Sequence, residues 1–368
     1  MKTIHKIIFS NSKQMKEIES SSIDLGITSP PYPMITLWDE SFANQNPAIG
    51  TALEKGDGTR AFELMHQELD CVWDELYRVL KSGGIACINI GDATRTIDNN
   101  FQLFPNHARI LSHCLHIGFQ SLPEIIWRKQ TNAPNKFMGS GMLPPGAYVT
   151  LEHEFILILR KGRKREFKSS EEKGNRKQSS YFWEERNNWF SDVWDFKGID
   201  QKLDDEKTRE RSAAYPFELA YRLINMFSVK EDIVLDPFLG TGTTMIAAMC
   251  AERNSVGYEL DSNLLDTISL RVQNVVEYSN NYIQNRLKNH LNFVSERLKA
   301  GKPLKHVNEH YGFPIITKQE TDLVFHDLKK VTPLNDHKFE VTYDEGLQIQ
   351  FENNKVKNKS LTNLSKWL

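Results

Sequence analysis

The sequence predicts an α/β fold built around a parallel β-sheet. Short apolar segments alternate with amphipathic segments along most of the chain, and this alternation is typical of strands joined by helices. In addition, the stretch "DIVLDPFLGTGTTMIAAMCAERNSVGYELD" reads as a strand, a glycine-containing turn, a helix and a second strand. A chain of 368 residues is long enough to bury the core of one large domain or two.

The first half of the chain supplies strands and two helices. The run 23–28, "IDLGIT", is mostly apolar and is expected to be a buried strand. Over 60–81 the apolar residues recur on one stripe, which predicts an amphipathic helix, and Gly83 and Gly84 should end it. Further elements are expected as strands at 85–90, 121–128 and 153–160 and as a helix over 104–117.

The second half is less regular. From about 162 to 211 no clean periodicity appears, and the run 160–178 is rich in Lys and Arg. Regular α/β character returns at Tyr215. It continues as a helix, a strand at 232–236, a helix, a strand at 255–260 and a helical region over 263–300. The tail 303–368 is expected to form a small separate α+β appendage.

Composition excludes several classes of protein. The formal net charge is -2, so any nucleic-acid site must be a local basic patch rather than the whole surface. No apolar run reaches the ~18 residues that a membrane-spanning helix needs, and the N-terminus lacks a signal-peptide pattern. The four cysteines lie far apart and suit a reducing compartment. We therefore expect a cytoplasmic protein, with no metal site.

The glycine turn indicates a nucleotide-like ligand. Gly240 and Gly242 follow a strand that ends at Asp236, and ligands of open α/β sheets bind at such strand ends. A phosphate-binding Walker loop needs a Lys that is absent, and Met245 occupies the place where a dinucleotide fingerprint requires a small residue. S-adenosylmethionine (AdoMet) fits better, because turn amides suit its carboxylate and the acidic strand end at Glu259 suits its ribose. A turn that only joins a strand to a helix is the alternative.

A second feature is the sequence "DLGITSPPYPM" at 24–34, where an apolar strand breaks on a rigid segment. Pro30 and Pro31 remove two backbone donors and cannot continue a paired strand. Taken alone, this segment is equally compatible with a stiffened turn. We refer to residues 29–32 as the hook.

Together, "TSPPY" and "DPFLGTGTT" resemble the amino-methylating DNA methyltransferases of restriction-modification systems, over most of residues 5–278. In that family Ser-Pro-Pro-Tyr is typical of N4-cytosine enzymes and Asp-Pro-Pro-Tyr of N6-adenine enzymes. The resemblance implies an AdoMet-dependent, Rossmann-like sheet in the circularly permuted order of the β group. It divides the chain into a catalytic half (1–161), a target-recognition insert (162–211), an AdoMet-binding half (212–300) and a C-terminal appendage (301–368).

The resemblance also implies site residues. The catalytic set is Ser29, Pro30, Pro31 and Tyr32. Ser29 and the Pro30 carbonyl would accept the hydrogens of a base amine, and Tyr32 would stack on the base. The cofactor set is Asn11, Thr28, Asp236, Pro237, Phe238, Gly240, Gly242, Thr243, Thr244, Glu259 and Asp261. Asn11 departs from the family, which often has Asp there.

The partner implied is double-stranded DNA, with the target base flipped out of the helix. The expected DNA contacts are Trp127, Lys129, Arg163, Lys164, Arg165, Lys168, Arg176 and Lys177. Trp127 suits the protein core equally well, and Trp183, Trp189 and Trp194 are expected to pack the core of the insert. The polar segment 33–59 is expected to be a lid or DNA-contacting loop.

These features predict a site-specific N4-cytosine DNA methyltransferase, monomeric or dimeric, that protects DNA from a partner restriction endonuclease. Alternatives are N6-adenine methylation, RNA methylation and a non-catalytic DNA-binding module. C5-cytosine chemistry is disfavoured, because that reaction uses a Pro-Cys nucleophile and no cysteine here follows a proline.

Overall fold

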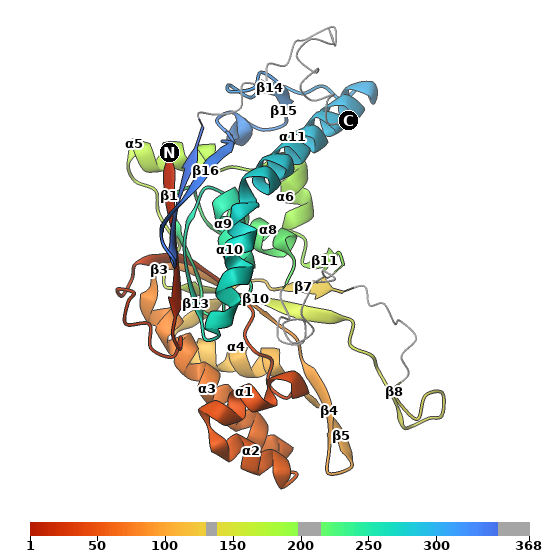
Figure 1. Cartoon of the computed structure of the whole chain (residues 1–368). Helices are drawn as coiled ribbons and strands as arrows, with labels where there is room; N and C mark the ends of the chain where they lie inside the picture. Colours follow the sequence, from red (N-terminus) through yellow and green to blue (C-terminus); the bar gives the residue numbers. More distant parts are fainter. Residues whose placement is uncertain (130–137, 198–214, 345–368) are drawn as a thin grey trace.

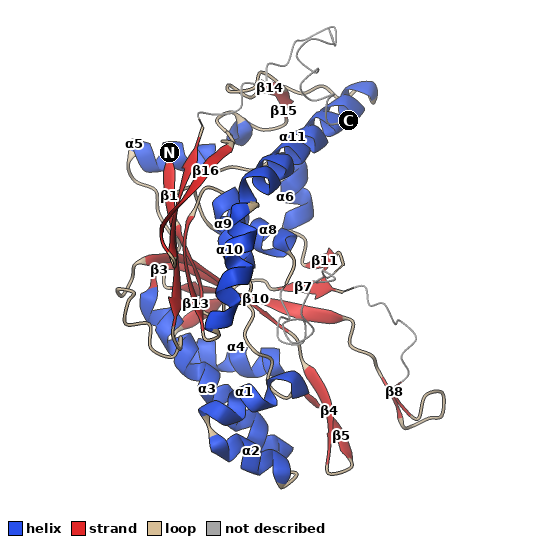
Figure 2. Ribbon diagram, viewed as in Figure 1, coloured by secondary structure: helices blue, strands red, loops and turns tan. Residues whose placement is uncertain are grey.

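The computed structural model describes residues 1–129, 138–197 and 215–344. A large twisted sheet crosses the molecule, and helices cover both of its faces (Figures 1 and 2). Within the described residues this sheet has 11 strands, in the order β11-β7-β10-β3-β2-β12-β13-β1-β17-β16, with β6 paired to β10.

The centre of the sheet is parallel. Its strands are β1 (Lys2–Phe9), β13 (Asn254–Glu259), β12 (Ile233–Asp236), β2 (Ile23–Thr28) and β3 (Leu80–Ile90). Each neighbouring pair among them runs in the same direction. Segments some 200 residues apart in sequence therefore end side by side, at what we call the carboxyl edge.

The sheet is extended on both sides by strands that pair antiparallel, except for β11, which is parallel to β7. Beyond β3 lie β10 (His153–Lys161), β7 (Ile125–Arg128), β6 (Phe119–Ser121) and β11 (Val193–Asp195). Beyond β1 lie β17 (Lys338–Tyr343) and β16 (Leu328–Asn335). The prediction of a separate C-terminal appendage is wrong for this hairpin, because β17 pairs directly with β1 and so belongs to the main sheet.

The helices form two layers. One layer contains α3 (Gly58–Val79) and α4 (Asn106–His116). The other contains α6 (Trp183–Trp189), α8 (Phe217–Phe227), α9 (Thr243–Cys250), α10 (Leu265–Gln273) and α11 (Val275–Lys299). Strand β3 is buried between the two layers. Its Ile85 and Cys87 pack with the second layer, whereas Ile88 and Ile90 pack with the first. Burial on both faces explains why β2, β12 and most of β3 lack the strict alternation of polar and apolar residues found in half-exposed strands.

Smaller elements surround this core. They are α1 (Asp39–Gln45), α2 (Pro47–Glu54), α5 (Ser170–Gln178), β4 (Ala93–Ile97), β5 (Asn100–Phe104), β8 (Met138–Gly139), β9 (Ala147–Tyr148), β14 (His306–Val307) and β15 (Pro314–Ile315). The predicted loop 33–59 is therefore largely helical. Asn46 caps α2 by accepting from the Ala48 amide, and Arg95 ties β4 to Asp39 of α1 at 2.7 Å.

The prediction that Gly83 and Gly84 end helix α3 is wrong. The helix ends at Val79, and Leu80 is already extended. Both glycines lie inside β3, where Gly83 has a φ of +87° and a Cβ on Gly84 would lie 3.1 Å from the Asp24 carbonyl oxygen. A glycine pair marks a close backbone approach as readily as a helix end, which is why the pattern misled.

The described part of the predicted insert is packed into the body of the protein. Trp189 and Trp194 are buried in the main core rather than in a small core of their own. Helix α6 is held against α11 by an ion pair between Glu185 and Arg286. Residues 198–211 of the insert lie outside the described residues.

Candidate active site

The carboxyl edge brings together the residues that the sequence singled out. The hook follows β2, the glycine turn follows β12, and Glu259 ends β13. Asn11 follows β1, whose Phe9 is in register with Glu259. Parallel strands end at one edge of a sheet, so their polar termini form one site although they come from distant parts of the chain.

The glycine turn is built for close approach by a ligand. Gly240 and Gly242 have φ values of +54° and +82°, and Gly242 precedes the first residue of α9. A Cβ added at Gly240 would meet no atom within 4 Å, so open space borders the turn. Arg271 of α10 supports the turn by donating to the Thr241 carbonyl oxygen at 2.8 Å and to Thr243 Oγ1 at 3.1 Å.

Glu259 closes one side of this turn. Its carboxylate accepts hydrogen bonds from the amides of Gly240 at 2.8 Å and Asp261 at 2.9 Å. Burial raises the pKa of Glu259 from its ordinary value, while these backbone donors oppose the rise. A carboxylate offers about four acceptor sites, so it retains capacity for ribose hydroxyls. The turn, its free space and this acidic group fit AdoMet.

Asp236 connects the glycine turn to the hook. It is buried and accepts hydrogen bonds from Thr28 Oγ1 at 2.7 Å, the Phe238 amide at 3.0 Å and the Tyr215 hydroxyl at 3.2 Å. Thr244 of α9 also donates to it. Asp236 thus ties the ends of β2 and β12 to the starts of α8 and α9. Burial raises its pKa. The hydrogen bonds of the Asp236 side chain therefore hold the surrounding segments of the protein in place.

The hook lies in a buried polar cluster. The Tyr32 hydroxyl is 3.1 Å from Ser29 Oγ, donates to Glu154 Oε2 at 2.9 Å, and accepts from Asn89 Nδ2 at 2.9 Å. Lys129 forms an ion pair with the other oxygen of Glu154. Burial, followed by the charge of Glu154, raises the pKa of Tyr32 well above its ordinary value, so the tyrosine keeps its proton.

Asn89 and Glu154 were not identified from the sequence. Asn89 interrupts the apolar run of β3 one residue before its end, and a polar residue in a buried strand is a signal that could have been used. Glu154 carried no such signal. It lies next to His153 at the start of an apolar strand, where a polar residue is ordinary and indicates no function. Tyr215 was identified from the sequence only as the point where regular α/β character returns, and no role in the site was assigned to it.

Trp127 is a core residue, and the prediction that it contacts DNA is wrong. Its side chain is 1% exposed and its indole Nε1 donates to the Phe196 carbonyl oxygen at 3.0 Å. Strand β7 is paired on both sides, by β10 and β11, and every second residue of it is buried. Trp127 falls on the buried face, beside Phe196.

The basic run 163–178, which was expected from the sequence to contact DNA, lies at the edge of the sheet opposite the hook. Arg165 pairs with Asp232 at 2.6 Å, immediately before β12 begins, and lies 3.6 Å from Asp24 near the start of β2. Strand β10 is antiparallel to β3, so the chain that follows it emerges at the amino ends of the parallel strands. Lys177 is paired as well, with Asp322 at 3.3 Å.

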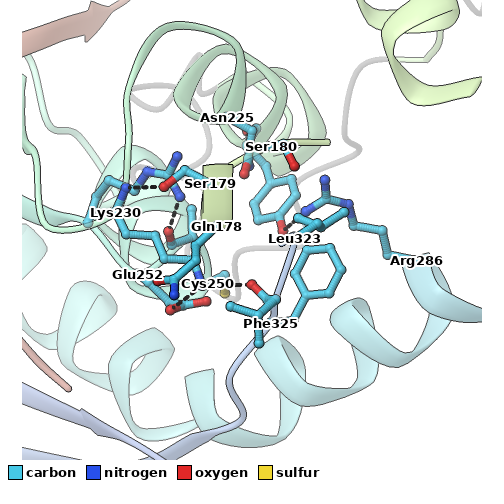
Figure 3. A pocket seen from close by; sticks show the side chains of 14 residues that line it. Gln178, Ser179, Ser180, Asn225, Lys230, Cys250, Glu252, Arg286, Leu323 and Phe325 are labelled. Atoms are coloured by element: carbon cyan, nitrogen blue, oxygen red, sulfur yellow. Dashed lines mark hydrogen bonds and ion pairs between the residues drawn. The ribbon is translucent and has the colours of Figure 1, made fainter. Parts of the chain in front are cut away.

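The small pocket in Figure 3 also lies at the amino ends of the parallel strands, which we call the amino edge. Buried charged groups line it, among them Lys230, Glu252 and Arg286. These groups pair with one another or with neighbouring protein groups, so the pocket is part of the structural core. In the described ranges, no cluster of three or more His, Cys, Asp and Glu side chains suits a metal ion. No helix of the described chain is long and apolar enough to cross a bilayer.

A glycine turn, an acidic strand end and a proline-stiffened hook at one edge of a parallel sheet define an AdoMet-dependent methyltransferase. Comparison with known families agrees. Residues 23–270 match the family N6_N4_Mtase, described as "DNA methylase". The chain belongs to this family of DNA methyltransferases, and its cofactor is AdoMet.

Two relatives are similar over much of their length. Type II methyltransferase M.MthZI of Methanothermobacter thermautotrophicus is 53% identical over 347 residues, covering 94% of this chain and 96% of the relative. Type II methyltransferase M.MjaI of Methanocaldococcus jannaschii is 49% identical over 281 residues, covering 73% of this chain and 91% of the relative.

Solved structures agree with the fold. TTHA0409 of Thermus thermophilus, described as a DNA modification methylase and crystallised with S-adenosyl-L-methionine, is 31% identical. It has a TM-score of 0.56, with 73% of this chain and 94% of that chain covered. The PvuII DNA methyltransferase, described as cytosine-N4-specific, has a TM-score of 0.52 at 15% identity, covering 76% of this chain and 92% of that chain. That likeness concerns the fold alone.

Replacing Glu259 with alanine should weaken AdoMet binding about 10-fold, because hydrogen bonds to a charged group are worth roughly 1.5–3 kcal/mol. Titration calorimetry with AdoMet measures the dissociation constant directly. Asp266→Ala is the matched control, since Asp266 is an exposed carboxylate on the neighbouring helix α10. An unchanged dissociation constant for Glu259→Ala would remove Glu259 from the cofactor site.

Proposed function

We propose that this protein transfers a methyl group from AdoMet to the N4 amine of cytosine in a short duplex DNA sequence. The observation that carries the proposal is the hook at the carboxyl edge, next to the glycine turn. Its first residue is a neutral serine, which is typical of the N4-cytosine branch of the family that the sequence resembles. N6-adenine methylation is the second candidate, because the same hook chemistry suits any exocyclic amine.

The residues of the hook activate the amine without removing a proton first. The amine nitrogen is a poor nucleophile because its lone pair is delocalised into the base. Ser29 Oγ and the Pro30 carbonyl oxygen each accept one amine hydrogen, which draws the nitrogen toward tetrahedral geometry. The two prolines hold these acceptors in place before the base arrives, so little reorganisation is needed. AdoMet supplies the electrophilic methyl group when it is bound, and alignment of the amine supplies much of the rate.

The cofactor contacts follow from the same edge. We assign the AdoMet carboxylate to the region of the glycine turn and the ribose to Glu259. The amides of Gly240 and Gly242 themselves donate to Glu259 and to the Leu239 carbonyl oxygen, so they shape the turn. Asn11 takes the place near the adenine where the family often has Asp. Its side-chain oxygen accepts from the Lys13 amide at 3.0 Å and its amide group contacts Gln45 at 3.4 Å. The other proposed cofactor residues (Thr28, Asp236, Pro237, Phe238, Thr243, Thr244 and Asp261) shape the pocket.

The DNA duplex is proposed to bind at the carboxyl edge, where the hook lies. Two hairpins extend from this side of the molecule, β4–β5 and β8–β9 (Figure 1). They touch through Phe101 and Tyr148, whose stacked rings are 4.4 Å apart. The tip of the second hairpin exposes apolar side chains: Met142 is 84% exposed and Leu143 is 72% exposed. Apolar side chains that enter a base step help to unstack a duplex, which base flipping requires.

Changing Met142 and Leu143 together to serine should weaken DNA binding about 10-fold, because the apolar contact with the bases is lost. Fluorescence anisotropy with a labelled duplex measures this affinity, and AdoMet binding should not change. Arg163→Ala with Lys164→Ala is the control at the opposite edge, and it should leave both the DNA affinity and its salt dependence unchanged. A weaker salt dependence in that control would place DNA at the amino edge instead.

The biological setting is proposed from the relatives, which are named Type II methyltransferases. We propose that the protein methylates one recognition sequence and so protects DNA from a partner restriction endonuclease. The test of the reaction is to methylate duplex DNA with labelled AdoMet, digest it to nucleosides and identify the labelled product by mass spectrometry. N4-methylcytosine supports the proposal, N6-methyladenine supports the second candidate, and AdoMet binding without any product would indicate a non-catalytic DNA-binding module.

A further inference from the structure

We propose that Glu154 is a positioning residue that sets the direction of a hydrogen-bond chain, from Ser29 to Tyr32 to Glu154, and thereby presents Ser29 Oγ to the substrate as an acceptor. This inference rests on the proposed function, because it concerns how the hook receives an exocyclic amine. It adds a role for the Tyr32 hydroxyl, which stacking of the tyrosine ring on a base does not need.

The argument begins with Glu154, which lies near the start of β10 and is 7% exposed. A carboxylate only accepts hydrogen bonds. Its Oε2 accepts from the Tyr32 hydroxyl at 2.9 Å and from Asn89 Nδ2 at 2.6 Å. The single hydrogen of the Tyr32 hydroxyl is therefore committed to Glu154.

This commitment decides what Ser29 can do. Ser29 Oγ and the Tyr32 hydroxyl oxygen are 3.1 Å apart, and either group is able to donate in isolation. Since the Tyr32 hydrogen points to Glu154, Ser29 must donate to Tyr32. Asn89 Nδ2 also reaches Ser29 Oγ, at 3.5 Å, so one lone pair of Ser29 Oγ is left to accept a hydrogen from the amine. A serine hydroxyl without this constraint rotates and presents its own hydrogen part of the time.

Two further groups hold Glu154 in this arrangement. Lys129 pairs with Oε1, which keeps a positive charge next to the carboxylate. Asn89 is 2% exposed and turns its NH₂ group to both Glu154 and the Tyr32 oxygen, at 2.6 and 2.9 Å. Tyr32 therefore faces one acceptor and two donor groups, and its hydrogen has one place to go. No proton is transferred along the chain, which acts by orientation alone.

The test is a set of double-variant cycles in which the single-turnover rate of methyl transfer is measured on saturating DNA and AdoMet. Tyr32→Phe keeps the ring and removes the hydroxyl, and we expect a rate about 10-fold lower. Glu154→Gln replaces the carboxylate by an amide that can also donate, and we expect a similar loss. Glu152→Gln is the matched control, because it makes the same carboxylate-to-amide change at an exposed residue two positions away. It should keep the full rate.

The deciding measurement is made in the Ser29→Ala background. If Tyr32 and Glu154 act through Ser29, neither Tyr32→Phe nor Glu154→Gln should lower the rate further by more than about twofold. A role in folding or in base stacking would instead multiply with the loss from Ser29→Ala, and that result would overturn the inference. A normal rate for Tyr32→Phe alone would overturn it as well.

The proposed function is judged separately. The methylated base formed by the unchanged protein identifies the reaction, whereas the cycles compare rates for whichever amine is methylated. N6-methyladenine as the product would therefore replace the proposed function and leave the hydrogen-bond chain to be decided by the cycles. AdoMet affinity and thermal unfolding of each variant show whether a slow variant is folded.

Discussion

Replacing Ser29 with alanine should lower the single-turnover rate of methyl transfer about 100-fold, because removing one preorganised hydrogen bond to the reacting group typically costs 10²–10³ in rate. The dissociation constant for AdoMet should stay within about twofold. Ser29 makes its hydrogen bonds to Tyr32 and Asn89 and none to the glycine turn among the described residues. The loss should therefore fall on chemistry and spare cofactor binding.

Rapid-quench measurements with labelled AdoMet give the single-turnover rate, and calorimetry gives the cofactor affinity. Ser22→Ala is a suitable control, because Ser22 lies just before β2 at the amino edge and its side chain donates to the Glu19 carbonyl oxygen, far from the hook. Parallel losses in rate and in AdoMet affinity for Ser29→Ala would contradict the role assigned to the hook.

Replacing Glu252 with glutamine should lower the free energy of unfolding by about 3–5 kcal/mol, the usual cost of breaking a buried ion pair by removing one charge. Lys230 Nζ lies 2.8 Å from Glu252 Oε2, and both side chains are almost fully buried (Figure 3). In the variant, Lys230 would keep its bond to the Val324 carbonyl oxygen at 2.7 Å and lose its counter-charge.

This loss should depend on pH. Burial alone would raise the pKa of Glu252, but the charges of Lys230 and His326 outweigh it and lower the pKa to about 2. Because the folded pKa lies below the unfolded one, the ionised carboxylate stabilises the fold fully above about pH 4.5, and this contribution is lost as the pH falls toward 2. The difference between the unchanged protein and Glu252→Gln should shrink over the same range.

Urea unfolding followed by circular dichroism at several pH values tests both statements. Asp344→Asn is the matched control, since Asp344 pairs with Lys329 in solvent, where water screens the interaction. That variant should unfold close to the unchanged protein. A Glu252→Gln variant as stable as the unchanged protein at neutral pH would show that the pair is replaceable by neutral groups.

The sequence by itself determined the class of fold, the central strands and the main landmarks of the site. The hook and the glycine turn were recognisable because their residues act locally: proline restricts its own backbone, and glycine permits the positive φ found at Gly240 and Gly242. Their order along parallel strands then required them to meet at one edge. Glu259 followed from the same rule.

Only the tertiary structure decided the rest, because it depends on strand direction and on contacts between distant segments. The antiparallel course of β10 sends the basic run 163–178 to the amino edge, and the pairing of β7 on both sides buries Trp127. The same strand β10 carries Glu154 back to the hook, 122 positions from Tyr32 in sequence. A charge pattern shows that a segment is basic or acidic, but the direction of the strand that carries it determines which groups it meets.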